Sequence, residues 1–150
     1  MIAERISELE LMEVWYEEDP TMRIRVTFPF FLGNGTRSTA VVYFEIDPGH
    51  RLGTHTDSAE EIILILEGTV EVSLGDEAGR LSAGEMALVP AMAPHGMRNA
   101  GDETVRVVGF FSSNVVVSTF DRPMMPFGQR AVGTPPVLEE EQVATGDSGA

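Results

Sequence analysis

Residues 48–68, PGHRLGTHTDSAEEIILILEG, organise this chain. The stretch opens on Pro-Gly, contains His55-Thr56-Asp57, and closes an apolar run with Gly68. On an extended strand, residues i and i+2 point to the same side, so His55 and Asp57 can face one interior together. Glu61 lies four residues after Asp57, at the start of the apolar run. The stretch therefore predicts two short strands with an imidazole and carboxylates close together.

The third histidine, His95, lies in a second stretch punctuated by proline and glycine, residues 84–99 (GEMALVPAMAPHGMRN). We expect the two stretches to meet in space and to form one metal pocket inside a small β-barrel. Two imidazoles and one or two carboxylates, from Asp57 and Glu61, suit Fe(II), Mn(II), Ni(II) or Zn(II). Two histidines and one carboxylate that leave coordination positions open are the arrangement of non-haem iron oxygenases.

Each of these residues also has an ordinary structural explanation. A single histidine in a β protein is more often a surface or hydrogen-bonded residue than a ligand. Asp57 could begin a turn, and Glu61 could be a solvated strand start. Their concentration favours the metal pocket, because the chain has only three histidines and two of them converge if a barrel closes.

The rest of the chain predicts an all-β domain. Short apolar or alternating runs recur at a spacing of about ten residues between Gly, Pro and Asp turns, which is typical of an antiparallel sandwich or barrel. Expected strands cover residues 22–30, 38–46, 53–57, 61–66, 70–74, 80–82, 86–89, 95–98, 104–111 and 115–120. We assign 1–21 to an N-terminal arm that is either a short helix or extended, 22–120 to the barrel, and 121–150 to a flexible acidic tail.

Composition excludes several classes of function. The chain has no cysteine and no lysine, which removes disulfides, thiolate metal sites and Schiff-base chemistry on a lysine side chain. The net charge of -14 repels phosphate backbones and anionic lipid, so no nucleic-acid or membrane partner is expected. The acidic N-terminus has no small-residue cleavage site, and no apolar run approaches the ~20 residues of a membrane span. We expect a cytoplasmic protein.

The first stretch resembles the first motif of the cupin family. That motif reads Gly, five residues, His-x-His, three or four residues, Glu, six residues, Gly. In this chain Gly49, His55, Glu61 and Gly68 match at the required spacing. Asp57 stands where the second histidine is usual.

The second stretch resembles the second cupin motif, which reads Gly, five residues, Pro-x-Gly, two residues, His, three residues, Asn. Gly84, Pro90, His95 and Asn99 match, and Met92 replaces the glycine. With the strands on either side, the resemblance extends over roughly residues 22–120.

The resemblance implies a double-stranded β-helix, or jelly-roll, barrel that binds a divalent metal ion near one open end. It assigns His55, Glu61 and His95 as metal ligands. Three alternatives stay open for Asp57: it binds the metal directly, it binds the metal through a water molecule, or it does not bind and the site has three ligands. It also implies a small-molecule substrate and a homodimer. The leading hypothesis is a metal-dependent enzyme with dioxygenase chemistry first, and isomerisation, cyclisation or decarboxylation would use the same pocket. Glu61 or Asp57, when not a ligand, could be the general base.

Other interpretations remain open. The barrel could bind or sense a small molecule without catalysis, or could have lost its metal, with Asp57 as the mark of that loss. The two histidines and Asp57 also resemble the triad of 2-oxoglutarate-dependent oxygenases, with Arg106 as the oxoacid-binding residue. His50 is expected at the barrel mouth, and Trp15 over a barrel edge or a partner subunit. Candidates for an apolar pocket lining are Phe28, Tyr43, Met86, Met97 and Phe110.

Overall fold

The computed structural model describes residues 1–135 and contains two six-stranded antiparallel sheets. In spatial order the first sheet contains β1 (Met12–Trp15), β2 (Arg23–Phe30), β3 (Ala40–Ile46), β10 (Val105–Phe111), β5 (Glu61–Glu67) and β8 (Met86–Val89). The second contains β12 (Gln129–Val132), β11 (Ser118–Met124), β4 (Arg51–Asp57), β9 (His95–Asn99), β6 (Thr69–Leu74) and β7 (Glu77–Ser82). Two short 3-10 helices, η1 (Ile6–Glu8) and η2 (Leu32–Asn34), complete the elements.

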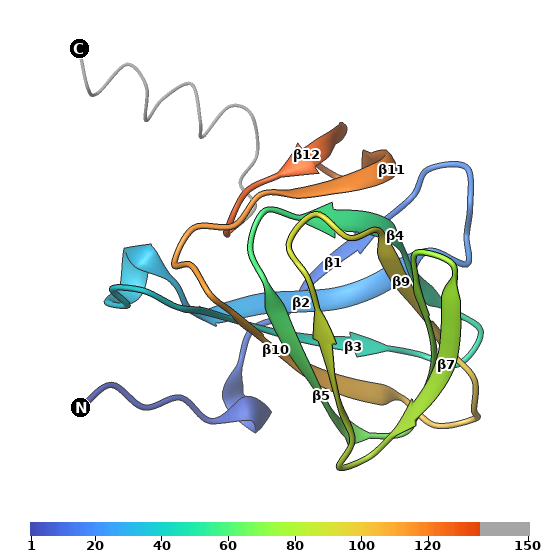
Figure 1. The fold of residues 1–150 in the computed structure, drawn as a ribbon, viewed down its shortest axis with the longest axis horizontal. Coiled ribbons are helices and arrows are strands. Elements are labelled where there is room, and N and C mark those ends of the chain that lie inside the picture. The colour runs from blue at the N-terminus through green and yellow to red at the C-terminus, as the bar shows by residue number, and fades with distance from the viewer. Residues whose placement is uncertain (136–150) are drawn as a thin grey trace.

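The predicted jelly-roll barrel is confirmed. In the sheets of Figure 1, β10 lies between β3 and β5, and β11 lies between β12 and β4. From β3 to β6 the chain crosses between the sheets at each step, which is why strands distant in sequence become neighbours. In the described part of the chain, no helix has the length and apolar character needed to cross a membrane.

Side chains that point inward at every second strand position form the core between the two sheets. In β5, Ile63 and Ile65 point inward and are almost fully buried, whereas Ile62 is exposed on the outer face. Because side chains alternate between the two faces of a strand, one apolar run supplies both core residues and surface residues. This alternation also sends the side chain of Glu61 inward, where it is buried.

The two motif stretches meet as predicted. Strands β4 and β9 are neighbours, and their register places His55 directly opposite His95. The backbone N–H of Met92 donates to the carbonyl oxygen of Asp57 at 2.8 Å, so the loop before β9 is tied to the end of β4. Met92, at the glycine position of the second motif, has a left-handed backbone with a φ of 65°. A residue that carries a Cβ is strained in this backbone conformation, which explains why the second cupin motif has a glycine at this position.

The predicted end of the barrel at residue 120 is too early. Strand β11 continues to Met124 and pairs with β12, and the predicted tail beyond residue 135 lies outside the described residues. Proline in residues 121–130 suggested a break, but Pro123 lies where the β11–β12 register is irregular. A proline is tolerated there because no ladder N–H is needed.

The N-terminal arm is partly strand. Residues 12–15 form β1 on the edge of the first sheet, and only Ile6–Glu8 form a helical turn. The backbone N–H and carbonyl of Trp15 are hydrogen-bonded to Met125 at 3.2 and 2.8 Å. This pair closes the gap between the first and second sheets, so Trp15 lies at a barrel edge as the sequence suggested.

Replacing Gly68 by alanine tests how tightly the first motif is packed. Gly68 has a φ of 84°, and an added Cβ would lie 2.8 Å from Val105 Cγ2. Gly49 has a φ of 80° but open space around it. We expect Gly68→Ala to lower the free energy of unfolding by about 2–4 kcal/mol through strain and collision, and Gly49→Ala by about 1 kcal/mol through strain alone. Urea denaturation measures both, and equal losses would contradict the predicted collision.

Candidate metal centre

The two histidines are held side by side with one ring nitrogen each directed into the barrel. Both are buried, and their ring centroids lie 4.1 Å apart. His55 Nδ1 is 2.8 Å from the carbonyl oxygen of Gly53, and His95 Nδ1 is 2.9 Å from that of Ala93. A carbonyl oxygen only accepts, so each Nδ1 carries the hydrogen. The Nε2 atoms are thereby directed to the centre as possible metal ligands.

Asp57 lies between the two histidines. Its Oδ2 is 3.2 Å from His95 Nε2 and 3.5 Å from His55 Nε2. Its other oxygen, Oδ1, accepts a hydrogen bond of 2.5 Å from the hydroxyl of Ser118 on β11. The register of β11 on β4 pairs Ser118 with Asp57, which places the hydroxyl at the carboxylate. Ser118 therefore fixes one carboxylate oxygen and leaves the other for the centre.

Glu61 reaches the same centre from the opposite sheet. Its side chain is buried, and its Oε1 lies 3.6 Å from His95 Nε2. Gly109 on β10 leaves room for this carboxylate because it has no side chain. A Cβ at this position would collide with the Glu61 carboxylate and with Val42. A glycine inside a strand often marks such a close approach. Glu61 therefore depends on Gly109 for its inward position.

The buried charges act on one another. Burial opposes the ionisation of Asp57, but His55, His95 and Ser118 hold the pKa of Asp57 below its usual range. Burial also opposes protonation of His95, yet the carboxylates of Asp57 and Glu61 outweigh it and raise the pKa of His95 to about 10. Burial and the Asp57 charge raise the pKa of Glu61. The centre thus favours a positive charge next to His95 Nε2.

The donor set fits a divalent cation. One donor atom each from His55, Asp57 and His95 lies within 4.8 Å of the other two. Ligand atoms bound to one ion at about 2.0–2.2 Å lie roughly 3–4 Å apart, so a small adjustment closes the shell. Asp57 Oδ2 and His95 Nε2 are buried and have no hydrogen-bond partner. Since buried polar atoms are rarely left unpaired, a cation between them would satisfy both.

A cavity of about 70 Å³ adjoins these residues inside the barrel. Its walls are mainly apolar and aromatic, and its polar side chains are those of the centre together with Ser118. Residues that form these walls include Val26, Phe28, Phe44, Leu52, Phe111 and Phe120. The ring of Phe120 stacks on His55 with centroids 4.6 Å apart, which holds the imidazole plane from one side.

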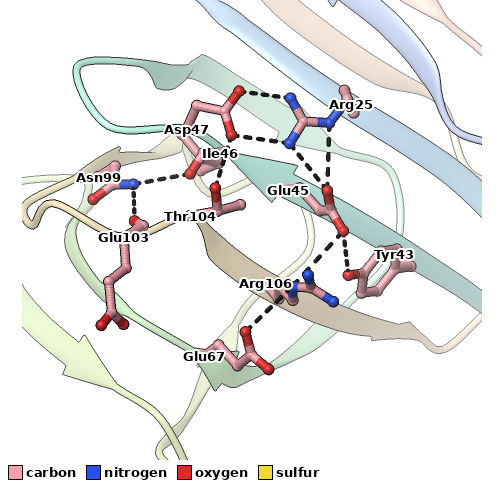
Figure 2. A network of polar contacts seen from close by, with 10 residues as sticks. All are labelled: Arg25, Tyr43, Glu45, Ile46, Asp47, Glu67, Asn99, Glu103, Thr104 and Arg106. Atoms are coloured by element: carbon pink, nitrogen blue, oxygen red, sulfur yellow. Dashed lines mark hydrogen bonds and ion pairs between the residues drawn. The ribbon is translucent and has the colours of Figure 1, made fainter. Parts of the chain in front are cut away.

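Two of the five predicted lining residues, Phe28 and Met97, line this cavity. The expectation was wrong for Met86 and Phe110, which are exposed on the outer face. It was also wrong for Tyr43, whose hydroxyl donates to Glu45 in the polar network outside the barrel (Figure 2). All three lie on strand positions whose side chains alternate away from the interior.

Arg106 and His50 do not belong to the cavity lining. Arg106 lies on the outer face of β10, with its Nε 3.2 Å from Glu67 Oε2 and 4.0 Å from Glu45 Oε2 (Figure 2). The oxoacid-binding role considered for Arg106 is therefore wrong, because its neighbours Val105 and Val107 take the inward positions. His50 precedes β4, at the opposite end of that strand from Asp57.

Asn99 of the second motif has a structural role. Its Nδ2 donates to the carbonyl oxygens of Ile46 at 2.9 Å and Glu103 at 2.7 Å (Figure 2). Its Oδ1 accepts from the Gly101 N–H at 2.9 Å. The side chain thus ties the end of β9 to the end of β3 and shapes the turn into β10. This requirement accounts for an asparagine at that spacing without any contact to the centre.

The sequence reasoning missed Ser118 and Gly109. A glycine in the middle of an apolar strand is a signal of close approach, so Gly109 could have been found from the sequence. Ser118 carries no such signal, because its position opposite Asp57 depends on the register between β11 and β4.

Comparison with known proteins identifies the domain. Residues 42–111 match the model of the cupin domain. A stretch of 62 residues is 37% identical to the polyketide synthase CurC of Streptomyces cyaneus, covering 41% of this chain and 40% of that protein. The chain therefore matches less than half the length of this curated relative.

Solved structures share the barrel. The polyketide cyclase RemF of Streptomyces resistomycificus superposes with a TM-score of 0.61 at 19% identity, over 74% of this chain and 78% of that one. The oxalate decarboxylase of Lactobacillus farciminis superposes with a TM-score of 0.64 at 18% identity, over 74% of this chain and 33% of that one. Residues 42–111 therefore belong to the cupin domain family, and the two motifs and the jelly-roll barrel agree with this assignment.

Proposed function

We propose that this chain binds a divalent metal ion and cyclises a small, carbonyl-rich organic molecule in the barrel. The observation that carries the proposal is the convergence of three ligand atoms, two of them buried and unpaired, beside an apolar cavity. The 37% identity to a polyketide synthase and the shared fold with a polyketide cyclase support the substrate class. Fold alone does not fix a reaction, so the residues must support the chemistry themselves.

His55, Asp57 and His95 are the proposed ligands. The Nδ1 hydrogen bonds of both histidines to backbone carbonyls fix each Nε2 toward the centre, and Ser118 fixes Asp57. The bound ion would polarise a carbonyl oxygen of the substrate as a Lewis acid. Coordination would also replace the proton that the carboxylates hold on His95, because a ligating imidazole must be deprotonated.

Glu61 is the proposed general base. Forming a carbon–carbon bond between two carbonyl-bearing segments begins with removal of a proton from the carbon next to a carbonyl. Burial raises the pKa of Glu61 toward the range where a carboxylate accepts and returns protons efficiently. Glu61 adjoins the three ligand residues without belonging to their group, so its carboxylate remains available for proton transfer.

The cavity walls would bind the carbon skeleton and exclude water. Aromatic side chains such as Phe28, Phe44 and Phe111 surround the space next to the polar centre. Apolar walls with a few converging polar groups are the usual design of small-molecule sites. A dioxygenase reaction would use the same residues with a redox-active metal and stays a prediction.

Metal analysis of untagged protein tests the centre. We expect close to one divalent ion per chain, and we expect His55→Ala or His95→Ala to lower the affinity by at least about 100-fold. His50→Ala is the matched control and should retain full metal content, because His50 lies outside the centre. Elemental analysis and titration calorimetry measure these changes. Equal metal content in all three variants would rule out the proposed ligands.

Replacing Ser118 by alanine tests how Asp57 is held. Loss of the Ser118 hydroxyl frees the carboxylate to rotate, so we expect the metal affinity to fall by about 10–100-fold. Ser73, exposed near the end of β6, provides the control variant Ser73→Ala, which should bind metal like the wild type. The readout is the dissociation constant from calorimetry. An unchanged constant in Ser118→Ala would show that Asp57 does not depend on this hydrogen bond.

Glu61→Gln separates the base from the ligands. With a panel of 1,3-dicarbonyl compounds, we expect turnover to fall by at least about 100-fold while metal content is retained. Glu67→Gln on the same strand is the control, because the Glu67 side chain is exposed. If Glu61→Gln also loses the metal, Glu61 is a ligand. Product formation with stoichiometric oxygen uptake would support a dioxygenase in place of a cyclase.

A further inference from the structure

The outer face of the second sheet has a groove, on the opposite side of β4 and β9 from the metal centre. In β9 the side chain of His95 points inward to the centre, whereas Arg98 is exposed on the outer face. Side chains alternate between the two faces of a strand, so one strand serves both spaces. The groove has a volume of about 480 Å³, compared with about 70 Å³ for the inner cavity. It is therefore large enough for a small organic molecule.

One row of strand-paired residues forms the charged side of the groove. Arg51 on β4 is paired with Arg98 on β9, Arg98 with Glu71 on β6, and Glu71 with Arg80 on β7. Within residues 1–135, these four are the charged side chains that line the groove, which we call the arginine groove. Three arginines and one glutamate make this surface positive, although the whole chain has a net charge of -14.

Small residues form the floor of the arginine groove. In the next row on the same face, Gly96 on β9 and Ala78 on β7 leave the space above the strands open. A Cβ at Gly96 would lie 3.1 Å from the carbonyl oxygen of Leu52, so β9 approaches β4 closely at this point. The groove thus combines a charged side with a low, uncharged floor.

The carboxylate of Glu71 shows that two of these arginines can hold one oxyanion together. Arg80 Nη2 is 3.2 Å from Glu71 Oε1, and Arg98 Nη2 is 2.5 Å from Glu71 Oε2. A guanidinium has five N–H donors, and Arg80 uses one and Arg98 two in their hydrogen bonds to Glu71. Both arginine side chains are more than 60% exposed, so a ligand can reach the other donors. Arg51 is instead paired with Asp19, outside the groove, at 2.7 Å.

We propose that the arginine groove binds a small organic anion, with its phosphate or carboxylate group held by Arg80 and Arg98 and its uncharged part on the floor. Guanidinium groups bind both kinds of oxyanion through charge-assisted hydrogen bonds. Glu71 balances only one of the two arginine charges, so the anion neutralises the other. The net charge of -14 does not prevent binding, because at 0.1 M salt the Debye length is about 10 Å and distant carboxylates are screened.

Three ligands with the same sugar ring test the proposal: glucose 6-phosphate, glucuronate and glucose. Each is titrated into the isotope-labelled full chain at 0.1 M NaCl, and amide chemical shifts report both affinity and position. We expect saturable shifts of amides in β6, β7 and β9 with at least one of the two anions, at a dissociation constant below about 5 mM, and none with glucose. The anion that binds more tightly identifies the charged group that the groove prefers.

Substitutions on the two sides of the groove locate the ligand. Arg80→Gln and Arg98→Gln should each raise the dissociation constant of the anion at least about fivefold, because each removes one of the two guanidinium groups. Arg37→Gln is the matched control, since Arg37 is exposed and lies outside the arginine groove. Ala78→Phe fills the floor without changing the charge and should weaken binding by a similar factor.

The proposal is overturned if neither anion binds saturably, or if glucose binds as tightly as the anions. Binding that the Arg80, Arg98 and Ala78 variants leave unchanged, or that Arg37→Gln weakens equally, would also contradict it. An anion that binds at the metal centre instead would lose affinity in His95→Ala and keep it in Arg98→Gln. Failure of the arginine groove is therefore distinguishable from failure of the proposed metal site.

Discussion

Four polar side chains buried within reach of one another are the constraint on which this structure depends. His55, Asp57, Glu61 and His95 are all at most 7% exposed, and two of their atoms have no hydrogen-bond partner. Burying charged groups is costly unless they are paired or bound to a metal. The surrounding hydrogen bonds partly meet this requirement, and a cation would complete it.

The jelly-roll topology is what brings the four groups together. Strands β4 and β9 place the two histidines opposite each other, and the crossing to β5 delivers Glu61 from the facing sheet. The hydrogen bond from Met92 N–H to the Asp57 carbonyl ties the two motifs at the centre itself. The strained left-handed backbone at Met92 indicates that this loop is held by its surroundings.

The fold and the candidate ligands could be predicted from the sequence because both motifs fix residue types at fixed spacings. Parity along a strand also predicted that His55 and Asp57 share a face. The sequence could not predict contacts that depend on strand register, such as that of Ser118 with Asp57. The inward position expected for Phe110 was wrong, because both faces of β10 carry large side chains. The continuation of β11 beyond residue 120 was not predicted because of Pro123. The register irregularity that accommodates this proline has no signature in the sequence.

The most direct measurement is the anomalous scattering of crystals grown with a divalent transition metal. We predict one strong peak per chain, about 2.0–2.2 Å from His55 Nε2, His95 Nε2 and an Asp57 carboxylate oxygen. The position of the Glu61 carboxylate in the same map would show whether it joins the shell or stays beside it. The account is contradicted if the metal occupies another part of the surface, or if no peak lies between the two histidines.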